Sequence, residues 1–63
     1  MWRQFERTKD RKPVLVNLDN VTLISDGGDN DQFENTALIY FVNDEDPVQV
    51  NEDYDVLLRE LTE

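Results

Sequence analysis

Most of the ionisable side chains of this chain are carboxylates. Its 63 residues include 15 Asp and Glu but no His and no Cys, so the usual general base, the commonest metal ligand and any thiolate are missing. Ser25 is the only serine, and it lies among acidic residues with no His to activate it. We therefore predict no catalytic residues, no cofactor and no enzymatic activity.

Two acidic clusters still offer oxygen ligands or proton carriers. Residues 26–31, Asp-Gly-Gly-Asp-Asn-Asp, have Glu34 nearby and supply the oxygens that Ca²⁺ prefers. In an EF-hand the glycine follows the third acidic position, whereas here both glycines come before Asp29 and Asp31, so the order does not fit. Asp44, Glu45 and Asp46 form a polar turn without the apolar flanks that would separate the pKa values of a carboxylate pair. We predict that both clusters are solvated and that neither is a metal site.

The charge of the chain is unevenly placed. The net charge is −9, but residues 1–12 carry five bases and two acids (+3), whereas residues 13–63 carry thirteen acids and one base (−12). A field of this sign repels phosphates, so we expect no direct binding of nucleic acid. The basic segment is expected to offset acids of neighbouring elements or of a second subunit.

No apolar run approaches the roughly 18 residues of a membrane span, and the N-terminus lacks the apolar region of a signal peptide. We expect a protein that does not bind membranes, and a cytoplasmic location.

Apolar and β-branched runs predict strands at residues 13–18, 21–24, 36–42 and 47–50. Residues 2–7 suit an edge strand, and residues 8–12 form a polar turn that can close a hairpin. Two adjacent glycines and several acids predict an acidic loop over residues 25–35.

The C-terminal residues 51–62 predict a helix. Asn51 is a suitable N-cap, acids follow in the first turn, and an apolar stripe recurs at helical spacing through Tyr54, Leu57, Leu58 and Leu61. The fold class is therefore α+β: a small antiparallel β-meander of four to five strands with one C-terminal amphipathic helix. We expect a single domain over residues 1–63, made of a basic lead-in (1–12), strands (13–50) and the helix.

The order of apolar and polar residues also resembles a known family. The pattern consists of Val14-Leu15-Val16-Asn17-x-Asp19-x-Val21-x-x-Ile24, then Thr36-x-Leu38, then Val48-x-Val50-x-Glu52-x-Tyr54-x-x-Leu57-x-x-Leu61. It is similar to the FlbD-like family of short bacterial proteins linked to flagella and swarming, and to related small bacterial or phage proteins. The chain departs from that family at Asn43-Asp44-Glu45-Asp46, where an Asn-Gly turn is usual, and in its longer loop 25–35 and its basic lead-in. The resemblance implies a small non-enzymatic protein without a chemical site.

Residues 36–42 are apolar on both faces of the predicted strand. Ala37, Ile39 and Phe41 alternate with Leu38, Tyr40 and Val42, as in a strand that is buried on both sides. One helix covers only one face of this strand, and the alternation of residues does not tell which of the two faces it covers. A second copy is the simplest cover for the other face.

Trp and Tyr are enriched at interfaces, so we predict an interface at Trp2, Leu38, Tyr40 and Val42, with Phe5 in the core. The favoured function is that of a small acidic, non-enzymatic protein–protein interaction module that forms a homo-oligomer, most simply a dimer.

An acidic surface also fits a different function. Carboxylates along strands and loops can imitate DNA phosphates and occupy the cleft of a basic DNA-binding protein, and small phage inhibitors resemble this chain in size and charge. The alternative hypothesis is that this chain is such an inhibitor and binds a basic partner protein. The partner would contact the acidic side chains of Asp26, Asp29, Asp31, Glu34, Asp44, Glu45 and Asp46. Acidic composition also arises for solubility alone, so both interpretations stay open.

Overall fold

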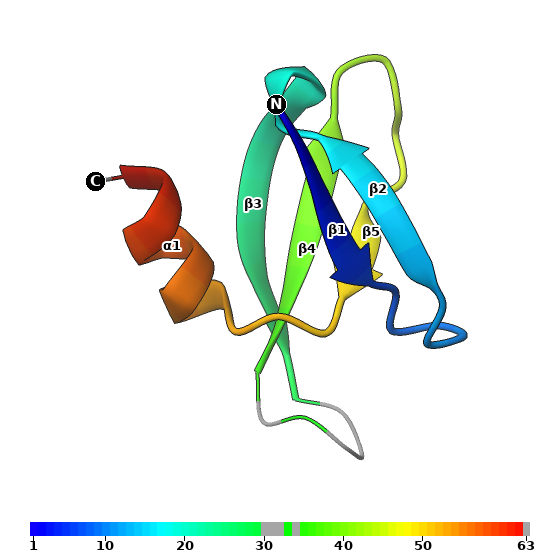
Figure 1. Ribbon diagram of the computed structural model, residues 1–63, viewed down its shortest axis with the longest axis vertical. Helices are drawn as coiled ribbons and strands as arrows, with labels where there is room; N and C mark the ends of the chain where they lie inside the picture. The colour runs from blue at the N-terminus through cyan, green and yellow to red at the C-terminus, as the bar shows by residue number, and fades with distance from the viewer. Residues whose placement is uncertain (30–32, 34, 63) are drawn as a thin grey trace.

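The computed structural model describes residues 1–29, 33 and 35–62, and these form five antiparallel strands and one helix (Figure 1). The strands are β1 (Trp2–Glu6), β2 (Pro13–Asn17), β3 (Val21–Gly28), β4 (Thr36–Phe41) and β5 (Val48–Val50). A 3₁₀ turn, η1 (Leu18–Asn20), joins β2 to β3, and the helix α1 (Tyr54–Thr62) ends the described chain. The predicted α+β class with a C-terminal helix is confirmed.

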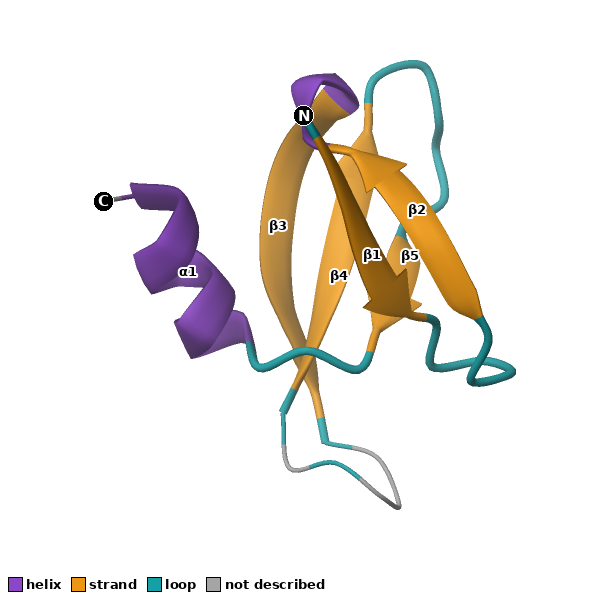
Figure 2. Ribbon diagram, in the orientation of Figure 1, coloured by secondary structure: helices purple, strands orange, loops and turns teal. Residues whose placement is uncertain are grey.

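The strands divide into two sheets. β1 and β2 form a hairpin, and β3, β4 and β5 form a three-stranded meander in that order. The hairpin crosses one face of the meander, whereas α1 lies beside β3 (Figure 2). One corner joins the two sheets, because Arg7 forms an antiparallel bridge with Val50 and Asn51 N–H donates to Glu6 O at 2.8 Å.

The core lies between the hairpin, the meander and the helix. Every element except β3 and η1 contributes a buried apolar side chain: Phe5, Val16, Ala37, Ile39, Val50 and Leu57. Phe5 is 3% exposed, which confirms its predicted place in the core. Alternation along a strand then fixes which faces look outward, because side chains next to a buried one point to the opposite face of the sheet.

Two sequence predictions are wrong in detail. Residues 25–28 were expected in the acidic loop, but they continue β3, opposite Leu38, Ala37 and Thr36 of β4. Gly27 lies in this strand, where Thr36 packs closely against it: a Cβ at Gly27 would come within 2.6 Å of Thr36 Oγ1. Gly27 therefore allows two strands to pack closely, although two adjacent glycines among acids predict a loop.

The helix begins at Tyr54, not near Asn51. Asp53 is the N-cap, since its Oδ1 accepts from Asp55 N at 2.8 Å. Asn51 instead joins the sheets through its side chain, which donates to Glu6 Oε1 at 2.8 Å and accepts from Thr8 Oγ1 at 2.7 Å. Within the described ranges, no helix is long and apolar enough to cross a membrane.

Candidate interaction surfaces

The meander exposes an apolar face on the side away from the core. Ala37 and Ile39 are fully buried, so Leu38 and Tyr40 point to the other face of β4, where both are half-buried. Val42 continues the same alternation just beyond β4 and is 52% exposed. Three of the four predicted interface residues therefore share one face, and the structure settles which face of residues 36–42 meets the core.

A further apolar residue on this face was missed by the sequence analysis. Leu23 of β3 lies directly opposite Tyr40 and is 54% exposed. A register shift between Val21 and Leu23 sets this pairing, and the shift is a property of the β3–β4 pair that strand patterning alone does not reveal. We call Leu23, Leu38, Tyr40 and Val42 the outer face.

Trp2, the fourth predicted interface residue, is not on the outer face. It lies in β1 opposite Asn17, and it points to the side of the hairpin away from Phe5. Trp2 is 65% exposed there, and Leu15 on the same side of the hairpin is 67% exposed. These residues form a second, separate apolar patch on the other sheet.

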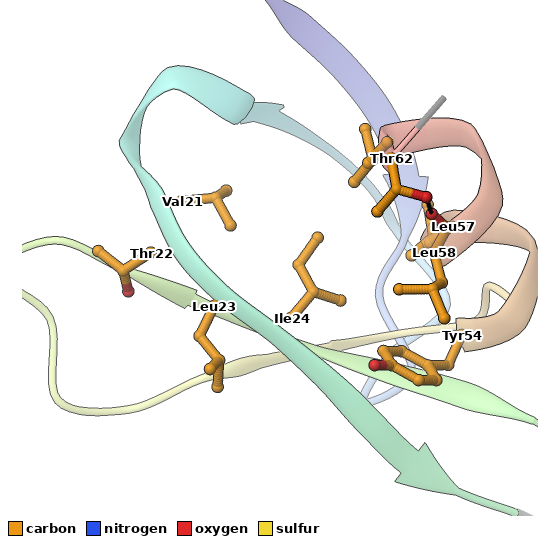
Figure 3. A pocket seen from close by; sticks show the side chains of 9 residues that line it. Val21, Thr22, Leu23, Ile24, Tyr54, Leu57, Leu58 and Thr62 are labelled. Atoms are coloured by element: carbon orange, nitrogen blue, oxygen red, sulfur yellow. Dashed lines mark hydrogen bonds between the residues drawn. The ribbon is translucent and has the colours of Figure 1, made fainter.

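A groove separates β3 from α1. It has a volume of about 240 Å³, and Figure 3 shows Ile24 of β3 on the side of Tyr54 and Leu58 of α1. Apolar side chains from both elements predominate among the residues that line it: Val21, Thr22, Leu23, Ile24, Tyr54, Leu57, Leu58, Leu61 and Thr62. Leu57 is the only buried residue of the predicted stripe, whereas Leu58 and Leu61 remain 46% and 44% exposed. The helix therefore closes the core but leaves the groove open.

The acids proposed for a basic partner lie in two groups. Asp26 and Asp29 are exposed at the end of the meander where β3 ends, whereas Asp44, Glu45 and Asp46 are exposed in the turn between β4 and β5. The six residues of β4 separate the two groups by roughly 20 Å. Asp31 and Glu34 lie outside the described residues. The acids described here thus do not form one continuous surface.

The basic lead-in is largely bound by nearby carboxylates. Arg3 Nη1 donates to Glu60 Oε2 at 2.5 Å, which joins β1 to α1, and the Arg3 guanidinium lies 5.0 Å from the centre of the Phe5 ring. Arg11 lies 3.6 Å from Glu6. The expectation that the bases offset acids of neighbouring elements is therefore confirmed for the Arg3 pair.

Arg7 pairs with Asp10 inside the turn of the hairpin. The hydrogen bonds from Arg7, helped by the backbone N–H of Lys12, lower the pKa of the Asp10 carboxyl from 3.8 to about 2. Both side chains are partly exposed, so this pair fixes the turn geometry more than it stabilises the fold. Its contribution is present above the ordinary carboxyl pKa and is lost as the pH falls toward 2.

The described residues hold little that points to chemistry. No group of three or more His, Cys, Asp or Glu in the described part of the chain is placed to hold a metal ion. Ser25, expected in a loop, lies within β3 opposite Leu38.

Comparison of the chain with protein-family models, with curated proteins and with solved structures finds no match. The resemblance to the FlbD-like family therefore stays a prediction.

Proposed function

We propose that this protein is a non-enzymatic protein–protein interaction module that forms a homodimer through the outer face. The observation that carries the proposal is the direct pairing of Leu23 with Tyr40 on the face of the meander away from the core, with Leu38 beside them and Val42 half-exposed. Apolar side chains gathered on one face of a sheet are typical of an interaction site, whereas single exposed apolar residues are ordinary.

A second copy suits this face because the face belongs to one sheet of a small domain. Two sheets pack face to face at a separation of about 10 Å, and a two-fold axis places the same surface of each chain against the other. A domain of about 60 residues buries only about 60% of its unfolded surface, so added burial at an interface contributes substantially to its stability. A dimer would cover the half-buried side chains of Leu38 and Tyr40.

The alternative, an acidic inhibitor of a basic DNA-binding protein, has less support. The described acids that such an inhibitor would use lie in two separate groups near the two ends of β4. The exposed apolar side chains lie outside these two acidic groups. We therefore take self-association as the conclusion.

Sedimentation velocity at micromolar concentration tests the proposal. We expect a mass near twice 7.4 kDa for the natural chain. Val42→Asp should weaken the dimer at least tenfold, because it places a charge in the apolar contact. Leu15→Asp is the matched control: it makes a more exposed residue acidic on the other sheet and should leave the mass unchanged.

A monomeric natural chain would refute the proposal, as would equal effects of the two variants. Tyr40→Asp provides a second variant on the outer face, and circular dichroism should show that each variant remains folded.

A further inference from the structure

The strand β3 has an open edge. It is the first strand of the three-stranded sheet and pairs with β4 on one side only. Among the described residues, no backbone hydrogen bond joins β3 to an element on its other side, where the groove lies. Alternate residues of an edge strand point their N–H and C=O groups outward, where another strand can bind them.

The groove lies at this same edge and has the size of a side-chain pocket. Its volume of about 240 Å³ is below the ~300 Å³ at which pockets typically begin to enclose small ligands. Figure 3 shows that Leu23 and Ile24 leave β3 in opposite directions, with Ile24 on the side of Tyr54 and Leu58. An extended segment beside β3 would likewise direct every second side chain toward one face.

The negative charge of the protein favours one kind of side chain on a segment that binds beside β3. Residues 13–63 carry −12, and Arg59 is their only base. Asp55 on the first turn of α1 and Asp26 on β3 are both exposed acids on the two elements that form the groove. Basic side chains on an incoming segment would therefore be attracted, and acidic ones repelled.

We propose that the groove binds an extended segment of a partner protein, which adds as a strand to the edge of β3 and alternates apolar with basic residues. The apolar side chains pack against Leu58 and Leu61, and the basic ones face solvent in the negative field of the protein. Backbone hydrogen bonds to β3 give affinity, and the groove gives specificity. This surface is separate from the dimer contact at Val42 and Leu38, and it shares only Leu23 with the outer face.

Fluorescence anisotropy with labelled peptides tests this on the natural chain. An eight-residue peptide that alternates Val and Lys should bind. A Ser–Lys peptide of equal charge should bind at least tenfold more weakly, because it has no apolar side chains. A Val–Lys peptide with alternate amides N-methylated should also lose at least tenfold, because its hydrogen bonds to β3 are blocked. Equal binding of all three peptides would overturn the proposal, and so would no binding of the first.

Variants of the helix locate the site. Leu58→Asp should weaken the Val–Lys peptide at least tenfold, whereas Val56→Asp, which changes an exposed residue of the same helix outside the groove, should not. Amide resonances of residues 21–24 and 54–62 should shift on titration of the natural chain, so the result does not depend on a variant folding.

Equal losses in the two helix variants would overturn the proposal. If Leu58→Asp instead turns a dimer into a monomer, the groove holds a second copy and the partner segment is excluded. If the peptide binds to a chain that sediments as a monomer, the proposed dimer fails while the groove proposal stands.

Discussion

At the scale of single residues, Thr36 explains a local feature that composition obscures. Among the described residues it is the only buried polar side chain. Its Oγ1 donates to Gly28 O at 2.8 Å and accepts from Gln49 Nε2 at 2.8 Å, so the hydroxyl joins all three strands of the meander. A Cβ at Gly27 would lie only 2.6 Å from this hydroxyl oxygen, so the position accommodates glycine and no larger residue without a shift.

Replacing this hydroxyl should destabilise the sheet although the volume is kept. Thr36→Val removes the acceptor of Gln49 and the donor to Gly28, and loss of a partner for buried polar groups costs about 1–3 kcal/mol of the free energy of unfolding. Urea denaturation measures the change. Thr22→Val on β3 is the control, because Thr22 is exposed, and it should change stability by less than about 0.5 kcal/mol. Equal changes would contradict the role assigned to Thr36.

At the scale of elements, Leu57 is the buried side chain by which α1 docks, while Tyr54 packs against the core only partly buried and Arg3 of β1 binds Glu60. Leu57 is fully buried in the core, whereas Leu61, one turn later in the same stripe, is 44% exposed. Leu57→Ala should lower the free energy of unfolding by about 2–5 kcal/mol and release the helix. Leu61→Ala should cost well under half of that. Thermal denaturation followed by far-ultraviolet circular dichroism measures both, and similar losses would show that the helix docks along its whole stripe.

Sequence patterns predict these elements well where the pattern is local. β-Branched runs predicted β2 and β4, and the helical spacing of apolar residues predicted α1. The errors arise where distant residues decide. Asn51 and Asp53 are both suitable N-caps, and the choice falls on Asp53 because Asn51 is held by Glu6 and Thr8, which lie 45 and 43 positions away. Neither contact is visible in a local pattern.

The candidate interface shows the same limit. Strand alternation correctly grouped Leu38, Tyr40 and Val42, but it could not add Leu23, whose place depends on a register shift, or separate Trp2, which belongs to the other sheet. The exposure of Leu58 also depends on the distance between α1 and β3, which is set by tertiary packing and cannot be predicted from the helical pattern.

At the scale of the whole molecule, net charge should govern the two proposed contacts in opposite ways. Two copies at −9 each repel one another, so raising the salt from about 0.05 M to about 0.5 M should strengthen the dimer several-fold as the repulsion is screened. The same change should weaken binding of the Val–Lys peptide. Sedimentation and anisotropy at several salt concentrations measure the two trends. A dimer that weakens with salt would show that it is held by ion pairs and not by the apolar outer face.

The corner at which the hairpin meets β5 has a kinetic consequence. The hairpin and the meander each form from neighbouring residues, but residues 6–8 bond to residues 49–51. Closing so long a segment costs chain entropy before any contact repays it, and distant contacts slow folding. We therefore expect the joining of the two sheets to be a late step of folding, after the hairpin and the meander have each formed.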